Sequence, residues 1–405
     1  MKKVKKVLFV ISYLCKGGAE RALSNITTHF PEDYEIEILV NNDKAIDYPY
    51  RGKIISLQIN ETPNTNSVLF QFKVLFKRIR RLWILKRENK YDACISFLDS
   101  ANIANILSGR RKCKVIVSVR ASLLEQSKLP QYKYVVNPLV KILYNHADKI
   151  VAVSEGIRKE LINNYSLNEK KVVTIRNGYD VPEIRKKATV TLDYHEETFF
   201  CDNKVVVTMG RLTEQKGQWH LIRAFREVVE EVPQARLLIL GTGHLEEKMK
   251  NLVEEFNLKD QVIFKGYIKN PYQYVALSKV FVLPSMYEGF PNALAEAVCL
   301  GIPCIATDFR TGAREILAPE MEELGETIKE MVESEYGILT PLCSGNQYIG
   351  REPLEYQEQC LARAILMLLQ NSQKRSEYIK KSQLRSRDLG IDEVVRKWIN
   401  IVDEQ

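Results

Sequence analysis

Two carboxylates, Glu288 and Glu296, lie eight positions apart in residues 282–297, which read VLPSMYEGFPNALAEA. The apolar start of this stretch predicts the end of a buried strand, and the residues from Pro291 onward predict a helix. Pro291 suits the first helical position, because the N–H that it lacks has no intrahelical partner there. The free amides and the positive dipole end of a helix attract anions, above all phosphate. The stretch therefore predicts an anion-binding turn with a carboxylate at its mouth and a second one along the helix.

Two cations stand on a glycine-flanked loop after an earlier predicted strand, Lys204–Met209. Arg211 and Lys216 lie between Gly210 and Gly217. An arginine offers a planar fork and a lysine a mobile point charge, which together suit a diphosphate. Taken alone, the pair fits a solvated loop better. Ligands of parallel α/β sheets gather at the carboxyl ends of strands, so we expect this loop and the Glu288 turn at one crevice.

Both halves of the chain show the same order of predicted elements. Residues 4–12 form a continuous apolar run, typical of a parallel strand buried on both faces, and Gly17-Gly18 and a helical pattern follow. The second half restarts at Lys204–Met209 in the same way. The sequence therefore predicts an α/β protein with two Rossmann-like domains and a small-molecule site in the cleft between them. Gly17-Gly18 fits either a plain tight turn or a backbone that a ligand approaches closely.

The predicted domain boundary lies in residues 181–203, a polar and weakly patterned stretch that predicts a linker. It separates an N-terminal domain, residues 1–180, from a C-terminal domain, residues 204–388. Residues 389–405 contain a final amphipathic helix around Trp398.

Positive charge is concentrated in the N-terminal part of the chain. Residues 1–180 contain 31 basic and 17 acidic residues, a net charge of +14, whereas the remainder carries −6. Residues 68–90 predict a basic, aromatic, amphipathic helix that could lie on an anionic membrane, or else an ordinary helix with its apolar side chains in the core. No nucleic-acid recognition module accompanies the charge, so nucleic acid is not an expected partner. The residues expected to face the membrane are Lys73, Lys77, Arg78, Arg80, Arg81 and Trp83.

The eight cysteines are scattered, without a CxxC motif or a His/Cys cluster in the sequence. Their spacing argues against a zinc site and a disulfide framework and favours a reducing cytoplasm. The N-terminal apolar run fits a buried strand better than a signal peptide, because it is short and lacks a cleavage site. No run reaches the about 20 apolar residues that span a bilayer.

Several short motifs are spread over the chain. They are Gly17-Gly18-Ala19-Glu20-Arg21, Asn177-Gly178, Gly210-Arg211-Leu212 with Lys216-Gly217, Gly241-Thr242-Gly243, Pro284-Ser285 and Glu288-x7-Glu296. Together they resemble the retaining GT-B glycosyltransferases of family GT4 (glycosyltransferase group 1), of the bacterial surface-polysaccharide type. The likeness covers nearly the whole chain. Its specific part is Glu288-x7-Glu296 with the upstream Arg/Lys loop, whereas each glycine pair alone is not specific.

The resemblance implies two facing Rossmann-like domains, with the donor in the C-terminal one, the acceptor in the N-terminal one and the last helix crossing back. Arg211 and Lys216 would bind the donor diphosphate and stabilise the leaving nucleotide without a metal or other cofactor. Glu288 would hydrogen-bond the donor sugar near its anomeric carbon, and Glu296 the ribose. The other expected donor-binding residues are Gly289, Phe290, Pro291, Asn292, Gly17, Gly18, Gly241, Gly243 and Tyr267.

Arg120 departs from the family pattern. Many relatives have a histidine after this strand of the N-terminal domain, near the donor sugar. Arg120 is expected either to contact phosphate or the acceptor, or to form a structural ion pair.

The implied reaction moves a hexose or N-acetylhexosamine from a nucleotide sugar, expected to be a UDP-sugar, to a glycan or polyprenyl-linked glycan in lipopolysaccharide or capsule synthesis. Retention in this family is usually assigned to attack from the face of the leaving group, whose phosphate takes the proton of the acceptor. The expected location is the cytoplasm, peripheral on the inner face of the cell membrane. The alternatives are a nucleotide-sugar epimerase or hydrolase on the same fold, and a non-catalytic membrane-associated scaffold.

Overall fold

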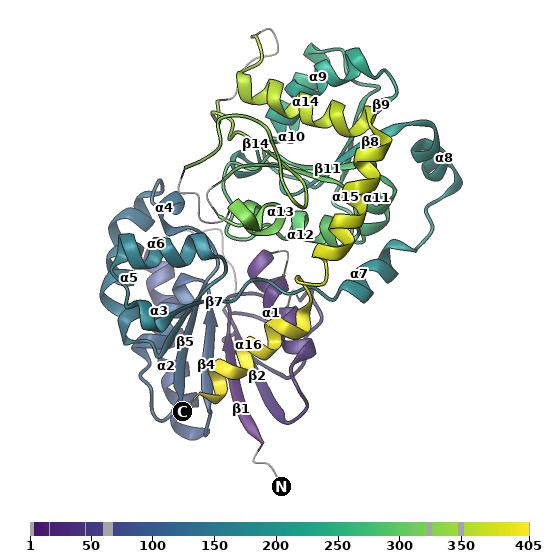
Figure 1. Ribbon diagram of the computed structural model, residues 1–405. Helices are drawn as coiled ribbons and strands as arrows, with labels where there is room; N and C mark the ends of the chain where they lie inside the picture. The colour runs from purple at the N-terminus through teal and green to yellow at the C-terminus, as the bar shows by residue number, and fades with distance from the viewer. Residues whose placement is uncertain are drawn as a thin grey trace. The chain divides into compact units, whose positions relative to one another are not determined.

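The computed structural model describes residues 4–15, 17–44, 46–59, 68–309, 311–321, 326–346 and 352–404 (Figure 1). The chain forms two compact units, each with its own buried core. Unit 1 comprises Met1–Gly178 and Ile391–Gln405, and unit 2 comprises Tyr179–Gly390. The chain therefore leaves unit 1 after Gly178 and returns to it for its last helix.

Unit 1 is built on a seven-stranded sheet in which every pairing is parallel. The order across the sheet is β3-β2-β1-β4-β5-β6-β7, so the winding direction changes between β1 and β4. At such a point the carboxyl ends of the strands leave a crevice for ligands. The strands are β1 (Lys5–Val10), β2 (Tyr34–Val40), β3 (Lys53–Ser56), β4 (Ala93–Phe97), β5 (Lys114–Val119), β6 (Lys149–Ala152) and β7 (Val172–Thr174).

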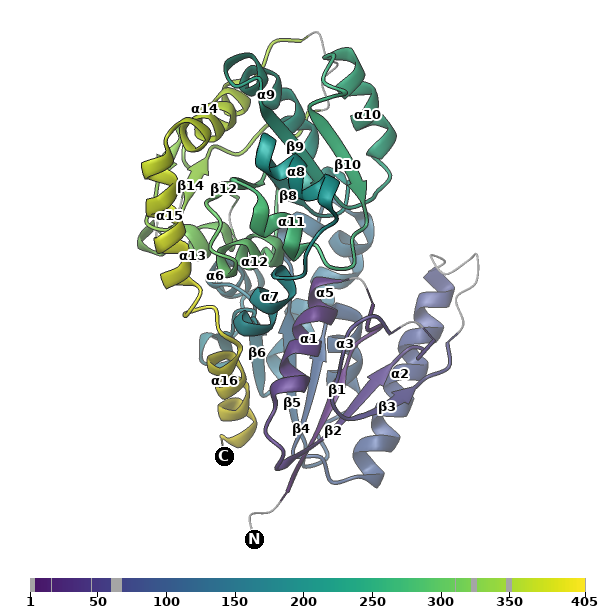
Figure 2. The ribbon, with the colours of Figure 1, turned by 90° about the vertical axis from the view of Figure 1, so that its right-hand side faces the viewer.

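Helices cover both faces of this sheet (Figures 1 and 2). α1 (Gly18–His29) and α16 (Ile391–Asp403) pack together on one face. α2 (Val68–Glu88) and α3 (Asp99–Leu107) pack on the other, where α3 also contacts α5 (Asn137–Leu143). The remaining helical segments of unit 1 are α4 (Leu123–Gln126), the π-helical turn η1 (Tyr132–Val136), η2 (Tyr144–His146), α6 (Glu155–Tyr165) and η3 (Glu169–Lys171).

The last helix is an integral part of unit 1. Trp398 of α16 is fully buried, and its ring lies 5.7 Å from the ring of Phe97, centroid to centroid. Tyr34 donates a hydrogen bond of 2.8 Å to Asp403, and Lys114 Nζ donates to the carbonyls of Ile401 and Val402 at 3.1 Å. These contacts bind the end of the chain to β2, β4 and β5 of unit 1.

Unit 2 repeats the architecture, with strand order β10-β9-β8-β11-β12-β14-β13 and only β13 antiparallel. The helices α9 (Gln218–Glu231) and α14 (Tyr356–Gln370) pack together over its main core. α12 (Asn292–Cys299) packs against α7 (Val181–Ala188) and α15 (Ser372–Arg385). The strands are β8 (Lys204–Met209), β9 (Ala235–Leu240), β10 (Val262–Gly266), β11 (Val280–Leu283), β12 (Cys304–Thr307), β13 (Val332–Glu333) and β14 (Ile338–Thr340); the other helical segments are α8 (Tyr194–Asp202), η4 (Glu214–Lys216), α10 (Glu246–Glu255), α11 (Tyr272–Leu277), α13 (Ala313–Leu317) and η5 (Pro319–Met321).

The linker predicted at residues 181–203 is wrong as a description of local structure. These residues form α7 and α8 and belong to unit 2. Asp180 caps α7, and Arg185 donates through Nε to the carbonyl of Cys299 at 2.9 Å. The stretch contains few apolar residues, so its helical pattern is weak in the sequence. N-terminal capping and packing on α11 and α12 stabilise the two helices.

Arg78 is a second correction, because it does not face outward from α2. Its guanidinium is buried and donates to Ser100 at 2.8 Å, Ser12 at 3.1 Å and Asn41 at 2.6 Å. Burial lowers the pKa of Arg78 to about 10, which still leaves the group charged at neutral pH. Arg78 therefore joins α2 to the loops that follow β1 and β2 and to α3.

Replacing Arg78 with methionine should destabilise unit 1. Arg78→Met keeps an apolar stem but leaves the buried oxygens of Asn41 and its neighbours without their donor, which costs about 2–3 kcal/mol. Arg80→Met, at an exposed position of the same helix, should change stability by less than about 0.5 kcal/mol. Urea denaturation of both variants measures the difference, and equal stabilities would show that the Arg78 contacts contribute little.

Candidate functional site

Glu288 lies in the loop between β11 and α12 and is held by three side chains. Ser285 Oγ donates to its Oε1 at 3.0 Å, Gln215 Nε2 donates to its Oε2 at 3.2 Å, and Lys216 Nζ forms an ion pair with Oε1. Thr311 additionally donates through its hydroxyl to the Glu288 carbonyl. Only 10% of the Glu288 side chain and 14% of the Lys216 side chain are exposed. The carboxylate is therefore oriented by side chains of the loops that follow β8 and β11, and the loop after β12 holds the Glu288 backbone.

The loop after β8 is joined to the loop after β11 through its backbone. Met286 donates its amide to the carbonyl of Gln215 at 2.8 Å, and Gln215 Nε2 reaches the carbonyl of Tyr287 at 3.1 Å. Gly217 adopts φ +61°, and a Cβ there would overlap the carbonyl oxygen of Pro284. A glycine is required at this position, because any side chain would separate the two loops.

Arg211 stands on the same loop, with an exposed side chain. Gln218, buried in the first turn of α9, donates to the Arg211 carbonyl at 3.1 Å and so fixes the backbone that carries the guanidinium. Arg211 and Lys216 thus lie on one short, braced loop, as expected from the sequence. In the described part of the chain, the Arg211 side chain forms no ion pair.

The glycines after β9, Gly241 and Gly243, allow the loop after β8 to approach closely. A Cβ on Gly241 would overlap the carbonyl of Gly210, and one on Gly243 would overlap the carbonyl of Leu212. Gly241 also donates its amide to Gly266 at 2.7 Å, one residue before Tyr267, whose side chain is 62% exposed. The carboxyl ends of β8, β9 and β10 therefore form one continuous edge.

Helix α12 begins one residue later than the sequence predicts. Pro291 is its N-cap and Asn292 its first residue, whose side chain accepts a hydrogen bond of 2.6 Å from Tyr179. Gly289, Phe290 and Pro291 are buried ahead of the helix. Glu296 follows inside it and is only 1% exposed, so its carboxylate lies within the protein beneath the helix N-terminus.

The candidates of unit 1 lie at the corresponding edge of their own sheet. Gly17 is the N-cap of α1 and Gly18 its first residue, after β1. Arg120 follows β5, donates to Asn177 Oδ1 and to Ser118 Oγ at 3.4 Å, and lies over the Phe97 ring at 5.4 Å. Two neutral side chains thus help to position the Arg120 guanidinium, and each of its expected roles stays a prediction.

The outer face of α2 combines basic and apolar side chains. Lys73, Lys77, Arg80, Arg81 and Trp83 are exposed, as predicted. The helix also exposes three apolar residues, against the alternative of an ordinary helix with its apolar side chains in the core: Leu69 at 74%, Phe72 at 55% and Phe76 at 69%. None of the described helices combines the length and the apolar content that crossing a membrane demands.

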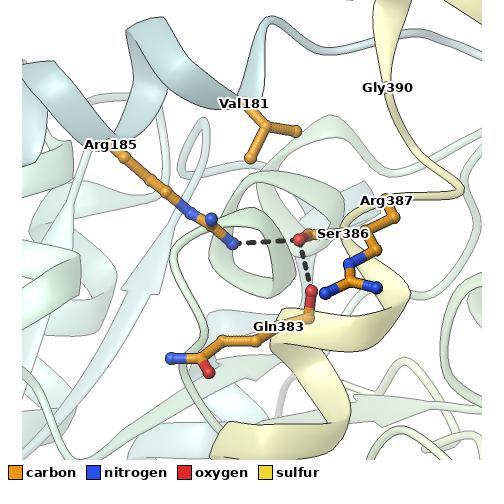
Figure 3. Close-up of a pocket in the computed structure, with 6 residues that line it drawn as sticks. All are labelled: Val181, Arg185, Gln383, Ser386, Arg387 and Gly390. Atoms are coloured by element: carbon orange, nitrogen blue, oxygen red, sulfur yellow. Dashed lines mark hydrogen bonds between the residues drawn. The ribbon is translucent and has the colours of Figure 1, made fainter.

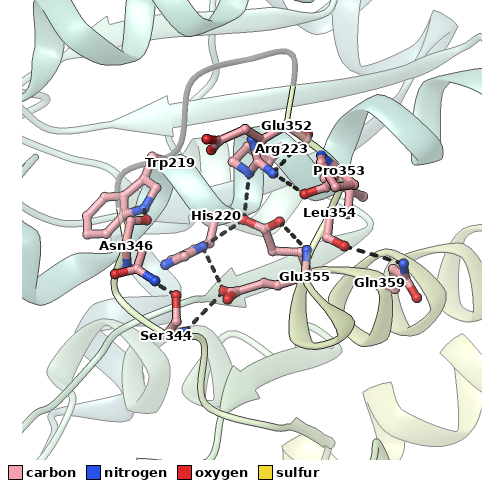
Figure 4. Close-up of polar contacts among 11 residues, drawn as sticks. Trp219, His220, Arg223, Ser344, Asn346, Glu352, Pro353, Leu354, Glu355 and Gln359 are labelled. Atoms are coloured by element: carbon pink, nitrogen blue, oxygen red, sulfur yellow. Dashed lines mark hydrogen bonds and ion pairs between the residues drawn. The ribbon is translucent and has the colours of Figure 1, made fainter.

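A buried polar cluster anchors the first turn of α9, which begins two residues after Lys216 (Figure 4). His220 Nδ1 lies 2.7 Å from Glu358 Oε1 and 3.3 Å from Glu355 Oε1, and Arg223 Nε donates to Glu358 at 2.9 Å. Trp219 Nε1 donates to the carbonyl of Asn346 at 2.8 Å. The cluster thereby fixes the helix that follows the cationic loop.

The same cluster corrects the expectation that no histidine and cysteine side chains lie together as potential metal ligands. His220, Cys343 and Glu355 place potential ligand atoms within 4.8 Å of one another, although they are far apart in the sequence. Burial and the nearby Glu355 raise the pKa of the Cys343 thiol well above its ordinary value, so the thiol stays protonated. All eight cysteines are free thiols. Independence from a metal stays a prediction.

A pocket of about 480 Å³ lies elsewhere in unit 2 (Figure 3). Arg185 donates to Ser386 Oγ at 2.9 Å on its wall. None of the predicted site residues lines it. Its lining residues are Val181, Arg185, Gln383, Ser386, Arg387 and Gly390.

Sequence reasoning missed the residues that orient Glu288. Gln215 and Thr311 carry no signal of their own, since an amide and a hydroxyl are common in loops. Ser285 was noticed only as part of a motif, without a role. Its position three residues before Glu288 and two residues after a buried strand is the signal that pointed to it.

Sequence profiles of two families match the chain. The one described as Glycosyltransferase Family 4 matches residues 16–183, and the one described as Glycosyl transferases group 1 matches residues 193–330. The two matches divide the chain much as the two units do.

Individual proteins agree with these matches. The chain is 32% identical over 349 residues to an uncharacterized glycosyltransferase of Methanocaldococcus jannaschii, which covers 84% of this chain and 85% of that protein. It is 28% identical over 316 residues to the N-acetylgalactosamine-N,N'-diacetylbacillosaminyl-diphospho-undecaprenol 4-alpha-N-acetylgalactosaminyltransferase of Campylobacter jejuni, covering 77% and 83%.

A solved structure agrees with the fold over nearly the full length. The crystal structure of Anabaena HepE with UDP and glucose superposes with a TM-score of 0.72 at 18% identity, covering 98% of each chain. Together with the two parallel sheets and the braced Glu288 loop, these matches show that the chain is a glycosyltransferase with the GT-B fold, and that it belongs to glycosyltransferase family 4.

Proposed function

We propose that this enzyme is a retaining transferase that moves a hexose or N-acetylhexosamine from a UDP-sugar to a lipid-linked glycan of a surface polysaccharide. The observation that carries the proposal is the Lys216–Glu288 pair, which joins the cationic loop to the loop that leads into α12. A sugar diphosphate has the matching order of groups, with hydroxyls at one end and two negative phosphates beside them. Glu288 suits the hydroxyls, and Lys216, Arg211 and the helix amides suit the phosphates.

The leaving group in such a reaction is an anion, and fixed positive groups lower its energy in the transition state. In the proposed reaction the acceptor hydroxyl attacks the anomeric carbon on the face from which the diphosphate departs. The bond from that carbon to the phosphate oxygen breaks, and the departing phosphate takes the hydroxyl proton. Arg211 and Lys216 supply the compensating charge, so we propose that no metal is needed. Glu296 would accept hydrogen bonds from the ribose.

The relatives support the choice of substrates. The Campylobacter protein is named for transfer to a diphospho-undecaprenol-linked glycan, and the HepE structure contains UDP and glucose. We therefore propose UDP as the donor nucleotide and a polyprenyl-linked glycan as the acceptor. Arg120, braced by Asn177 and Ser118 at the end of β5, is the proposed acceptor-side contact in unit 1.

An acceptor of this kind is embedded in a membrane, and the outer face of α2 suits its surface. Five exposed cations would contact anionic headgroups, and the exposed aromatic side chains would enter the interfacial region. We propose that the enzyme lies on the cytoplasmic face of the cell membrane through this helix. The cations are Lys73, Lys77, Arg80, Arg81 and Arg87.

A screen of UDP-hexoses and UDP-N-acetylhexosamines, each with and without polyprenyl-diphosphate glycans, tests the reaction. We expect UDP release that depends on the acceptor, with EDTA present throughout, and an α-linked product from an α-linked donor. Rapid turnover of the donor alone would favour a hydrolase or an epimerase. Complete inactivity with all donors, together with normal folding, would favour a scaffold.

Glu288→Gln should lower kcat on the order of 100-fold or more, because a positioned transition-state contact is lost while the shape is kept. Steady-state kinetics with a saturating donor measure the effect. Glu214→Gln is the matched control, since Glu214 lies on the cationic loop but pairs with His244 at 2.9 Å, and it should retain the parent rate. A Glu288→Gln enzyme with the parent kcat would remove Glu288 from the proposed site.

Neutralising the outer face of α2 should release the enzyme from anionic vesicles. Each cation near such a surface contributes about 1 kcal/mol, so four substitutions should weaken binding by about two to three orders of magnitude. Flotation with phosphatidylglycerol-containing vesicles measures this, and unchanged binding would contradict the proposal. The variant carries Lys73→Gln, Lys77→Gln, Arg80→Gln and Arg81→Gln; its control, with the same charge change on other exposed surfaces, carries Lys250→Gln, Lys259→Gln, Lys380→Gln and Arg396→Gln.

A further inference from the structure

Residues 128–142, here called the β5–α5 segment, expose large apolar side chains on a well-formed helical scaffold. They span η1 and most of α5. Tyr134 is 70% exposed, Ile142 64%, Leu129 51% and Val135 45%. Apolar side chains scattered singly on a surface need no explanation, but a group of them on one short segment marks an interaction site.

The opposite side of this segment is firmly packed. Val140 in the segment and Tyr144 just after it are fully buried, and the Tyr144 hydroxyl donates to Asp99 at 3.0 Å and accepts from Asn102 at 3.2 Å. The inward and outward positions alternate with a helical period. The exposed residues therefore stand on a fixed framework, and their exposure is not the result of a loose loop.

The charges that the segment itself contributes are all positive, and one of them, Lys128, pairs with Glu125 at 2.7 Å. Lys128, Lys133 and Lys141 are exposed, and residues 126–147 contain no aspartate or glutamate. Lys133 lies 5.4 Å from the ring of Tyr134 and Lys141 5.8 Å from the ring of Tyr165, and neither forms an ion pair within the described residues. An apolar stripe flanked by the unpaired cations Lys133 and Lys141 matches an anionic lipid surface, where headgroups lie above an apolar layer.

The β5–α5 segment shares a helix layer with α2. α2 packs on α3, and α3 packs on α5, on the same side of the unit 1 sheet (Figures 1 and 2). The segment also follows Arg120 closely in the chain, with only α4 between them. It therefore connects a candidate lipid contact to the proposed acceptor side of this unit.

We propose that the β5–α5 segment is a second membrane contact, distinct from α2, that inserts Tyr134, Val135 and Ile142 below the headgroups of an anionic lipid surface. Lys133 and Lys141 then bind the headgroups. The biological role of this contact rests on the proposed function, because a lipid-linked acceptor is reached at the membrane. The contact itself does not depend on it. Two contacts in one helix layer fix the orientation of unit 1 on the surface, which one helix alone cannot do.

Flotation of the full chain with phosphatidylcholine vesicles containing phosphatidylglycerol tests the contact. The double variant Tyr134→Ser, Ile142→Ser should bind on the order of tenfold or more weakly, because apolar area no longer leaves water. Lys133→Gln with Lys141→Gln should also weaken binding, by about fivefold for each lysine. Tyr194→Ser is the control, since Tyr194 is 78% exposed but lies in unit 2, and it should leave binding unchanged.

Insertion has a direct readout that simple electrostatic attraction lacks. In a Trp83→Phe background, Tyr134→Trp should show fluorescence quenching by brominated lipid, whereas Tyr194→Trp should not. Equal quenching at both positions, or unchanged flotation of Tyr134→Ser, Ile142→Ser, would overturn the proposal. So would a change in the sedimentation of that variant without any change in flotation, because it would identify the segment as a contact between two copies of the chain.

The test separates this inference from the proposed function. The variant Tyr134→Ser, Ile142→Ser should transfer sugar to a short, water-soluble acceptor at the parent rate. It should lose activity only on an acceptor that is embedded in vesicles. A parent enzyme that floats but transfers no sugar would contradict the proposed function and leave the membrane contact intact. Loss of transfer to the soluble acceptor in the variant would instead assign these residues to acceptor binding and overturn the proposal.

Discussion

The contact between the loops after β8 and β11 is the constraint on which the candidate site depends. Gln215 joins them through both its carbonyl and its side chain, and Gly217 permits the backbone of one loop to reach the carbonyl of Pro284 in the other. Lys216 and Glu288 meet only because these loops are held together. Each of the two charges is compensated by the other, so neither is buried alone. In the proposed donor complex the diphosphate would take over the lysine, while Glu288 would keep Ser285 and Gln215.

Behind this contact, two sets of buried polar groups keep the helices in place. The His220–Glu358–Arg223 cluster holds the start of α9, and Gln218 holds the backbone of Arg211. In unit 1, Arg78 plays a comparable part between α2 and the loops after β1 and β2. Buried charges of this kind stay where they are because an unpaired group in the interior is costly.

Unit 1 presents two different surfaces. One face of its sheet is closed by α1 and α16, where Trp398 completes the core. The other face is covered by α2, α3 and α5, whose outer sides expose aromatic, aliphatic and basic side chains together. A group of exposed apolar side chains marks an interaction surface, and the proposed contact with a membrane-borne acceptor would use it.

The sequence by itself determined the fold class and the candidate donor residues. Continuous apolar strands, glycine turns and Glu288-x7-Glu296 are local patterns. Such patterns can be read from neighbouring residues without knowledge of the contacts between distant ones. It did not reveal α7 and α8, whose order comes from capping and packing on α11 and α12, nor the start of α12 at Asn292. Which side of a basic helix faces inward was equally hidden, since Arg78 and Arg80 are the same residue type two positions apart. Only the tertiary structure decided that Arg78 is enclosed by Ser12, Asn41 and Ser100, that His220 meets Cys343 and Glu355, and that Gln215 and Ser285 orient Glu288. All of these depend on groups far apart in the chain, and their meeting is set by the packing of whole elements rather than by any neighbouring residues.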